Sequence, residues 1–155
     1  MPYTPRPNPM TRRLIDSLYI EAMVLSDEAR SYFDGFNLSD RMQLGGRTRV
    51  IFSCEALKVT TRLMHSVAWL LSQRARMGSN SAAQVAAAAL GRATTSEAPL
   101  IADLPDDAQR IIAGSMDLYD RILRLEAGLG AAWSGENNPA FHLQQRLHQS
   151  LFSGG

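Results

Sequence analysis

Three stretches of this sequence carry apolar residues at alternating steps of three and four positions. This spacing keeps one side of an α-helix apolar, so it predicts amphipathic helices that pack along their length. The average step of roughly 3.5 residues favours the shallow crossings of helix bundles. No stretch alternates apolar and polar residues for long enough to predict a convincing strand. The predicted fold class is therefore all-α, an antiparallel three-helix bundle.

The expected helices are bounded by residues that begin or end helices. The first runs from a Thr11 cap to Gly35, where we expect a left-handed glycine. The second covers about residues 47–77, stops at Gly78 and is the longest, and the third opens at Pro105 with acids in its first turn. The predicted core stripes are Ile15, Leu18, Ala22, Leu25, Ala29 and Tyr32 in the first; Val50, Cys54, Leu57, Thr61, Met64, Ala68, Leu71 and Ala75 in the second; and Leu104, Ala108, Ile111, Ser115, Leu118, Ile122, Leu125 and Leu129 in the third.

The other segments flank or connect a bundle domain that we place at residues 11–130. Prolines crowd the N-terminus, and residues 1–10 are predicted to be disordered. The alanine-rich stretch 81–90 predicts a short extra helix in the connection between the second and third helices. The C-terminal tail, 131–155, carries a brief amphipathic pattern that is either a docked fourth helix or a flexible tail with a possible short helix. A pattern this short is marginal as an isolated helix, which favours the flexible tail.

Composition excludes several classes of protein. The single cysteine, Cys54, excludes an intramolecular disulfide and a cysteine-based zinc motif, and it fits a reducing compartment. No run of about 18 apolar residues predicts a membrane span. The first residues lack the apolar stretch of a signal peptide. We therefore expect a cytoplasmic protein.

Residues capable of chemistry do not form a pattern typical of an active site. The Gly45–Gly46 pair lacks the strand and the spacing of a cofactor loop, and the three histidines are not spaced to bind a metal. Cys54 lies on the predicted core stripe, where a thiol usually packs as a small apolar group. Glu55 is expected to face Arg62 and a cation on an adjoining helix. We predict no catalytic residues, no cofactor and no metal.

A second line of residues runs beside the predicted core stripe of the second helix. It consists of four basic or titratable side chains, a serine and a tryptophan: Lys58, Arg62, His65, Trp69, Ser72 and Arg76. Because Trp and Arg are favoured interface anchors, one hypothesis is a protein-binding strip made of Lys58, Arg62, His65, Trp69 and Arg76. The alternative is that a neighbouring helix covers Trp69 and pairs its acids with the cations. The sequence leaves both open.

The central segment reads CEALKVTTRLMHSVAWLLSQRA from Cys54 to Ala75. It resembles the alphaproteobacterial family of the regulator of CtrA degradation, the RcdA-like protease adaptors, in a glutamate followed by Thr-Thr-Arg-Leu-Met, Ala-Trp-Leu-Leu and Gln-Arg-Ala. The matching residues are Glu55, Thr60, Thr61, Arg62, Leu63, Met64, Ala68, Trp69, Leu70, Leu71, Gln73, Arg74 and Ala75. The first helix and the Leu-Tyr-Asp-Arg at 118–121 are also similar to the family, so the resemblance covers roughly residues 14–130.

The resemblance implies a dimerising three-helix bundle that serves as a non-enzymatic adaptor of the ClpXP protease. It implies a role in regulated proteolysis during the cell cycle, with a response-regulator-like priming factor and a protein cargo as partners. Family members carry a flexible C-terminal tail that matters for cargo. From the tail's own amphipathic pattern we predict that its contacts include Phe141, Leu147, Leu151 and Phe152.

The distribution of charge suggests an alternative function. From Arg47 to Arg76 six basic residues stand against one acid, Glu55, while the flanking segments lean acidic. Such a segment either binds nucleic acid or forms a middle helix packed between acidic partners. The net charge of +1 and the lack of a dense Lys/Arg run favour the second. The alternative function is a small helical DNA-associated regulator, and an enzyme would need a pocket ringed by Glu55, His65 and Tyr119.

Overall fold

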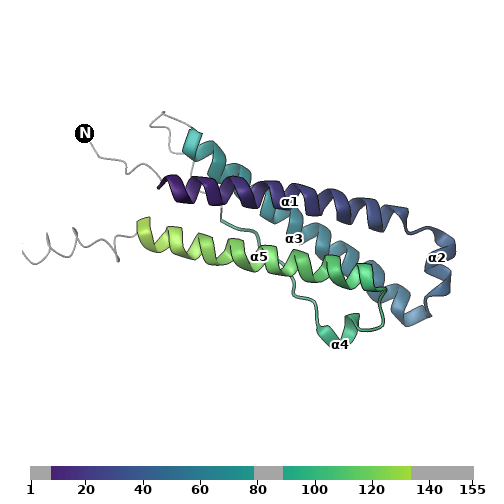
Figure 1. Ribbon diagram of the computed structural model, residues 1–155. Helices are drawn as coiled ribbons and strands as arrows, with labels where there is room; N and C mark the ends of the chain where they lie inside the picture. The colour runs from purple at the N-terminus through teal and green to yellow at the C-terminus, as the bar shows by residue number, and fades with distance from the viewer. Residues whose placement is uncertain (1–7, 79–88, 134–155) are drawn as a thin grey trace, which may run out of the picture. The chain divides into compact units, whose positions relative to one another are not determined.

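The computed structural model describes residues 8–78 and 89–133, and every regular element within these ranges is an α-helix. Three helices are long: α1 (Pro9–Gly35), α3 (Gly46–Gly78) and α5 (Asp106–Trp133). Two are short: α2 (Leu38–Gln43) joins α1 to α3, and α4 (Ala98–Ile101) lies between α3 and α5 (Figure 1). The predicted all-α fold, with three long helices and a short extra helix in the second connection, is confirmed. Helix α2 was not predicted.

The chain divides into two compact units, Met1–Ile122 and Leu123–Gly155. The first unit contains the described parts of α1 to α4 and the part of α5 that ends at Ile122. The second unit begins with the remaining residues of α5. All packing, hydrogen bonds and ion pairs described below lie within the first unit.

The three long helices do not all alternate in direction. Arg74 on α3 pairs with Asp16 on α1 at 2.9 Å, whereas Phe33 near the end of α1 meets Phe52 near the start of α3. These contacts make α1 and α3 antiparallel. Figure 1 shows α3 and the part of α5 up to Ile122 each running back along α1, and the ion pair between Arg110 of α5 and Glu28 of α1 at 2.6 Å fits this arrangement. The antiparallel prediction therefore holds for α1 against both partners, but α3 and α5 run parallel to each other.

The N-cap of α1 is Asn8, three residues before the predicted cap at Thr11. The Asn8 side chain accepts a hydrogen bond from the Met10 amide at 3.0 Å, and Pro9 occupies the first helical turn. Proline fits this position because its missing N–H would have no helical partner. Thr11 is therefore inside the helix, and its prediction as the cap is wrong. The helix ends at Gly35 as expected, but Gly35 does not adopt the left-handed conformation.

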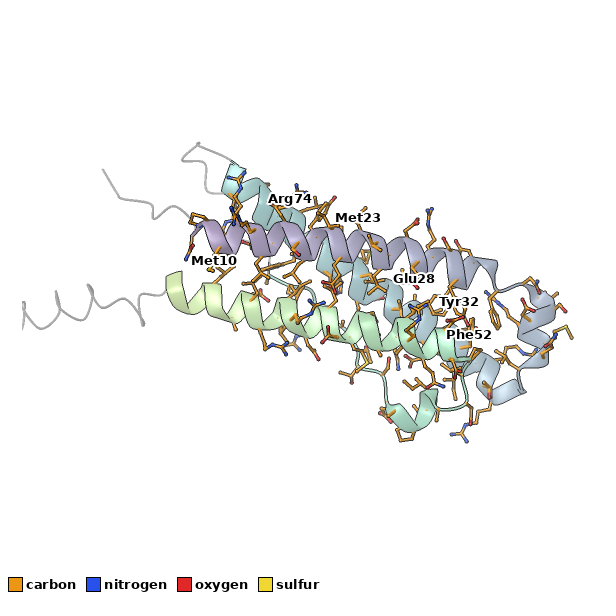
Figure 2. All side chains as sticks on the ribbon, viewed as in Figure 1. Met10, Met23, Glu28, Tyr32, Phe52 and Arg74 are labelled. Atoms are coloured by element: carbon orange, nitrogen blue, oxygen red, sulfur yellow. The ribbon has the colours of Figure 1, made fainter. Side chains whose placement is uncertain are left out.

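The buried faces of α1 and α5 follow the predicted stripes. On α1, Ile15, Leu18, Ala22 and Ala29 are buried as predicted, and Phe33 joins them. The third predicted stripe is buried from Leu104 to Ile122. The ring of Phe52 brings α3 into this core, stacked on Phe36 with 4.5 Å between centroids and close to Tyr32 (Figure 2).

Some predicted segments reach beyond the described residues. The helix expected over 81–90 lies outside them except at its end, where Ala89 and Leu90 are not helical. Helix α1 already begins at Pro9, inside the N-terminal segment expected to be disordered. Helix α5 continues to Trp133, past the expected end of the bundle, and the rest of the tail is outside the described part. Residues 8–78 and 89–133 include no helix long and apolar enough to cross a membrane.

Candidate functional site

Helix α3 turns a different face to the core from the one predicted. The predicted core stripe of this helix points outward: Val50, Leu57 and Met64 are 63%, 69% and 59% exposed. Cys54, Ala68, Leu71 and Ala75 are also exposed, and Thr61 is half-buried. We call these eight residues the α3 stripe. The prediction that they form the core is wrong, and with it the prediction of a buried Cys54 thiol.

The residues predicted to form a surface strip lie on the opposite side of α3. Arg62 and Trp69 are buried, with 1% and 2% of their surface exposed. Lys58, His65 and Arg76 are half-buried at the edge of this face. The prediction of a surface strip is therefore wrong for Arg62 and Trp69, and the first part of the alternative, that neighbours cover Trp69, is correct. The second part, pairing of the cations with acids of a neighbouring helix, does not hold for Lys58, which pairs with Glu55 of α3 itself. Steps of three and four define a face but not which of two such faces turns inward.

The buried face of α3 holds the connection that follows it. Residues 89–97, which we call the strap, have no regular structure and lead into α4. The Arg62 guanidinium donates to the Thr94 carbonyl through Nε at 3.1 Å and Nη2 at 3.0 Å. It also donates to Ser115 Oγ on α5 at 2.9 Å and to Ser96 Oγ on the strap. One buried arginine thus ties α3, the strap and α5 together.

Glu55 completes this polar cluster. The Ser96 hydroxyl donates to one carboxylate oxygen of Glu55, and Lys58 pairs with the other at 2.7 Å. Burial lowers the pKa of the Arg62 guanidinium, and the nearby Glu55 carboxylate opposes that effect. The prediction that Glu55 neighbours Arg62 is confirmed, although Ser96 bridges them and the second cation, Lys58, comes from α3 itself.

The other end of the strap is held at Gly91. The Tyr119 hydroxyl donates to the Gly91 carbonyl at 2.7 Å. A Cβ at position 91 would come within 2.6 Å of the His65 ring, so a side chain there would displace the ring. From Gly91 beside His65 to Ser96 beside Glu55, the strap runs back along α3 toward its N-terminal half. Glu55, His65 and Tyr119 therefore all lie beside the strap. Glu55 contacts Ser96, and Tyr119 and the His65 ring lie at Gly91.

The residues of the strap were not identified from the sequence. The Glu55 and Arg62 positions, two turns apart on one helix, signalled a polar cluster. No local pattern indicates that Thr94, Ser96 and Gly91 complete it, because these contacts join residues 28 to 41 positions apart.

The outward face of α3 is neutral as well as apolar. None of the eight stripe residues is charged. The hydroxyls of Thr60 and Thr61 donate to the carbonyls of Ala56 and Leu57 at 2.9 Å, and Ser53 bonds the Arg49 carbonyl at 3.2 Å. Hydroxyls satisfied inside their own helix can be covered by an apolar partner with little desolvation cost. A long exposed apolar patch of this kind usually marks an interaction site.

Several basic side chains of α3 are engaged within the bundle. Lys58 pairs with Glu55, and Arg62 is buried in the strap cluster. The Arg74 guanidinium pairs with Asp16 and lies 4.4 Å from the centroid of the Tyr19 ring. Of these three cations, only Arg74 pairs with an acid on a neighbouring helix, as the interpretation of α3 as a helix packed between acidic partners predicts.

The remaining site predictions are not tested by these contacts. Phe141, Leu147, Leu151 and Phe152 lie outside the described part of the chain. Among the described residues, no group of three or more His, Cys, Asp or Glu side chains is placed to hold a metal ion.

Comparison with known proteins gives one match. The chain matches the family described as "Protein of unknown function (DUF1465)" over residues 7–151. A search of the curated proteins and a search of the solved structures each found no match. The matched range includes α1, the α3 stripe, the strap and α5. By this match over most of its length, the chain belongs to the DUF1465 family.

Proposed function

We propose that this protein is a non-enzymatic cytoplasmic adaptor that works by protein–protein binding through the α3 stripe. The observation that carries the proposal is the stripe itself, an exposed face from Val50 to Ala75 with no charged member. Apolar side chains at heptad-like spacing gain stability when another protein removes them from water. A solvated helix face is normally polar, so this face is built to be covered.

The proposed partners come from the resemblance to the RcdA-like adaptors. They are the ClpXP protease, a response-regulator-like priming factor, a protein cargo and a second copy of the chain. The motif residues Glu55, Arg62 and Trp69 are buried. Much of the resemblance thus rests on residues that build the bundle, and it supports a shared fold more directly than a shared partner.

An adaptor needs no covalent step. A rigid bundle that holds the protease with one surface and cargo with another raises the effective concentration of cargo at the unfoldase. In this proposal Phe141 to Phe152 serve as the cargo-binding arm. The half-buried cations at the edge of α3, Lys58 and His65 among them, remain candidates for contacts beside the stripe.

The test is capture of ClpX from a lysate by the tagged full-length chain and by variants of the stripe. Val50→Glu and Leu57→Glu place a carboxylate on the α3 stripe. Val24→Glu is the matched control because Val24 is 62% exposed, close to the 63% of Val50, but lies on α1. We expect the wild type and the Val24 variant to retain ClpX and the stripe variants to retain less.

Equal retention by all four proteins would show that the stripe takes no part in binding. Retention of ClpX by none of them would contradict the adaptor proposal. A fifth protein that ends at Gly130 tests the arm, since loss of cargo with retention of ClpX would assign cargo binding to the tail.

The alternative is a DNA-associated regulator that uses the basic residues of α3. Lys58, Arg62 and Arg74 are each paired or buried, whereas Arg47 and Arg49 at the start of α3 are exposed. Neutralising phosphates requires accessible Lys and Arg side chains, and binding then weakens steeply with salt.

A further inference from the structure

We propose that α2 and the first turn of α3 form a docking surface for a protein segment that carries both acidic and apolar side chains. The surface, which we call the α2 corner, consists of Leu38, Met42, Arg47 and Arg49. None of these residues belongs to the α3 stripe, so the inference goes beyond the proposed function and does not depend on it. The anchoring of α2, the exposure of its apolar side chains and the charge of the residues that follow it carry the inference.

Helix α2 is held in place at the end of the bundle where α1 leads into α3 (Figure 1), although none of its residues is buried. The Asn37 side chain caps it by accepting a hydrogen bond from the Asp40 amide at 3.0 Å. The Arg41 guanidinium donates through Nε to the Phe36 carbonyl at 3.1 Å, and the Phe36 ring stacks on Phe52. Because a helix this short is not stable alone, these contacts keep α2 folded.

The two large apolar side chains of α2 are exposed to solvent. Leu38 is 73% exposed and Met42 is 64% exposed. They are four positions apart, so they lie on the same side of the helix, one turn from each other. A helix that covers no part of the core does not need apolar side chains in order to fold. The exposed leucine and methionine on an anchored helix therefore indicate a contact with another protein.

The chain that follows this apolar pair is basic. From Arg41 to Cys54 it contains three arginines and no acid. Arg47 and Arg49 are exposed at the start of α3, and no acid in the described part of the chain pairs with either of them. The Cα atoms of Met42 and Arg47 are at most about 18 Å apart, at roughly 3.6 Å per residue. A partner that covers the apolar pair is therefore also within reach of two guanidinium groups.

Charge and hydrophobicity together select the occupant. Carboxylates of a protein segment pair with the arginines, and its apolar side chains cover Leu38 and Met42, so both halves of the α2 corner are satisfied. A nucleic acid would neutralise the arginines and leave the apolar pair in water. A membrane surface calls for a longer amphipathic helix or a cluster of about four to eight cations. The α2 corner provides neither, which favours the protein segment.

The experiment selects ligands of the full-length protein from a displayed library of random peptides. The library is first depleted on a variant that carries Arg47→Glu and Arg49→Glu, so that peptides for other surfaces are removed. We expect the peptides then enriched on the wild type to combine acidic with apolar residues. Fluorescence anisotropy of a labelled synthetic copy of the most enriched peptide measures its affinity for each protein. Leu38→Ala together with Met42→Ala is expected to weaken binding more than about tenfold, as loss of interface anchors does.

The matched control variants lie on α1. Ile20→Ala removes an apolar side chain as exposed as Met42, and Arg12→Glu together with Arg13→Glu reverses two exposed arginines. Both are expected to bind the peptide as the wild type does. A copy of the peptide with lysine in place of its acids is expected to prefer the variant with reversed charges at the α2 corner. A variant that had lost its fold would not show this preference.

Four outcomes would overturn the proposal. They are the absence of any enriched peptide, enriched peptides without acids, equal binding by the Leu38 and Met42 double variant, and equal loss of binding in the α1 controls. Cosedimentation of the wild type with phosphatidylserine vesicles in place of peptide binding would assign the α2 corner to a membrane and also overturn it. Leu57→Glu, which alters the α3 stripe, is expected to leave peptide binding unchanged. Capture of ClpX through the stripe and peptide binding at the α2 corner can therefore fail separately.

Discussion

At the scale of single residues, the unexpected feature is a cluster of charged side chains inside the bundle. Glu55 and Arg62 are each 1% exposed, and Ser96 bonds both. Removing two charges from water costs several kcal/mol unless their hydrogen bonds are replaced. Here the Thr94 carbonyl, Ser115 and Lys58 supply replacements. The cluster therefore depends on the strap remaining in place.

Replacing Ser96 by alanine tests that dependence. Ser96→Ala removes a buried hydroxyl that serves both Glu55 and Arg62, and we expect it to lower the free energy of unfolding by about 1–3 kcal/mol. Urea denaturation followed by circular dichroism measures the change. The control is Thr95→Ala, at an exposed neighbouring position, with an expected change within about 0.5 kcal/mol. Equal stabilities for the two variants would mean that the cluster does not hold the strap.

At the scale of elements, the strap is what permits α3 and α5 to run parallel. Two parallel helices need a connection that returns along their whole length. The strap makes part of that return against α3 and α5, and its ends are held by Tyr119 and Glu55. If α3 and α5 were antiparallel, a short loop could join them, and no buried arginine would be needed to hold a long connection in place.

The boundary of α1 gives a prediction at the same scale. Asn8→Ala removes the acceptor for the Met10 amide and is expected to destabilise the protein by about 0.5–2 kcal/mol. Thr11→Ala, at the position expected from the sequence to cap the helix, should change stability by less than about 0.5 kcal/mol. Thermal unfolding at one protein concentration compares the two. A larger loss from Thr11→Ala would contradict the observed helix start.

At the scale of the whole molecule, α3 has more apolar surface than one bundle can cover. Leu63 and Leu70 on one face are buried with Trp69, while Leu57 and Met64 on the other stay exposed. The buried face of α3 also carries the polar cluster of Glu55 and Arg62. The continuous apolar series of this helix, the α3 stripe, therefore lies mostly outside the core. Association is the means by which such a chain can bury the second face.

The proposed association with a second copy of the chain would make stability depend on protein concentration. The thermal midpoint of the wild type is expected to rise as the chain concentration increases, because pairing stabilises only the folded state. Leu57→Glu should have a midpoint that does not change with concentration. Differential scanning calorimetry over a wide concentration range measures both, and a wild-type midpoint that stays constant would argue against pairing.

Much of the fold could be predicted from the sequence because helix periodicity is a local property. The three long helices, the Pro105 opening of the last and the buried faces of α1 and α5 all follow from residues three or four positions apart. The α3 stripe was also found as a continuous apolar series. Its assignment to the core was wrong because an apolar face has the same pattern whether its own fold or another protein covers it.

The sequence by itself determined the helices and their apolar faces, since backbone hydrogen bonding and side-chain periodicity act within a few residues. Only the tertiary structure decided which face of α3 is buried and that α3 and α5 are parallel. It also decided that Arg62 and Glu55 meet the strap. These outcomes depend on contacts between residues far apart in the chain, 53 positions in the bond from Arg62 to Ser115 and 58 in the ion pair of Arg74 with Asp16. Such contacts form only when the connection folds back along the helices.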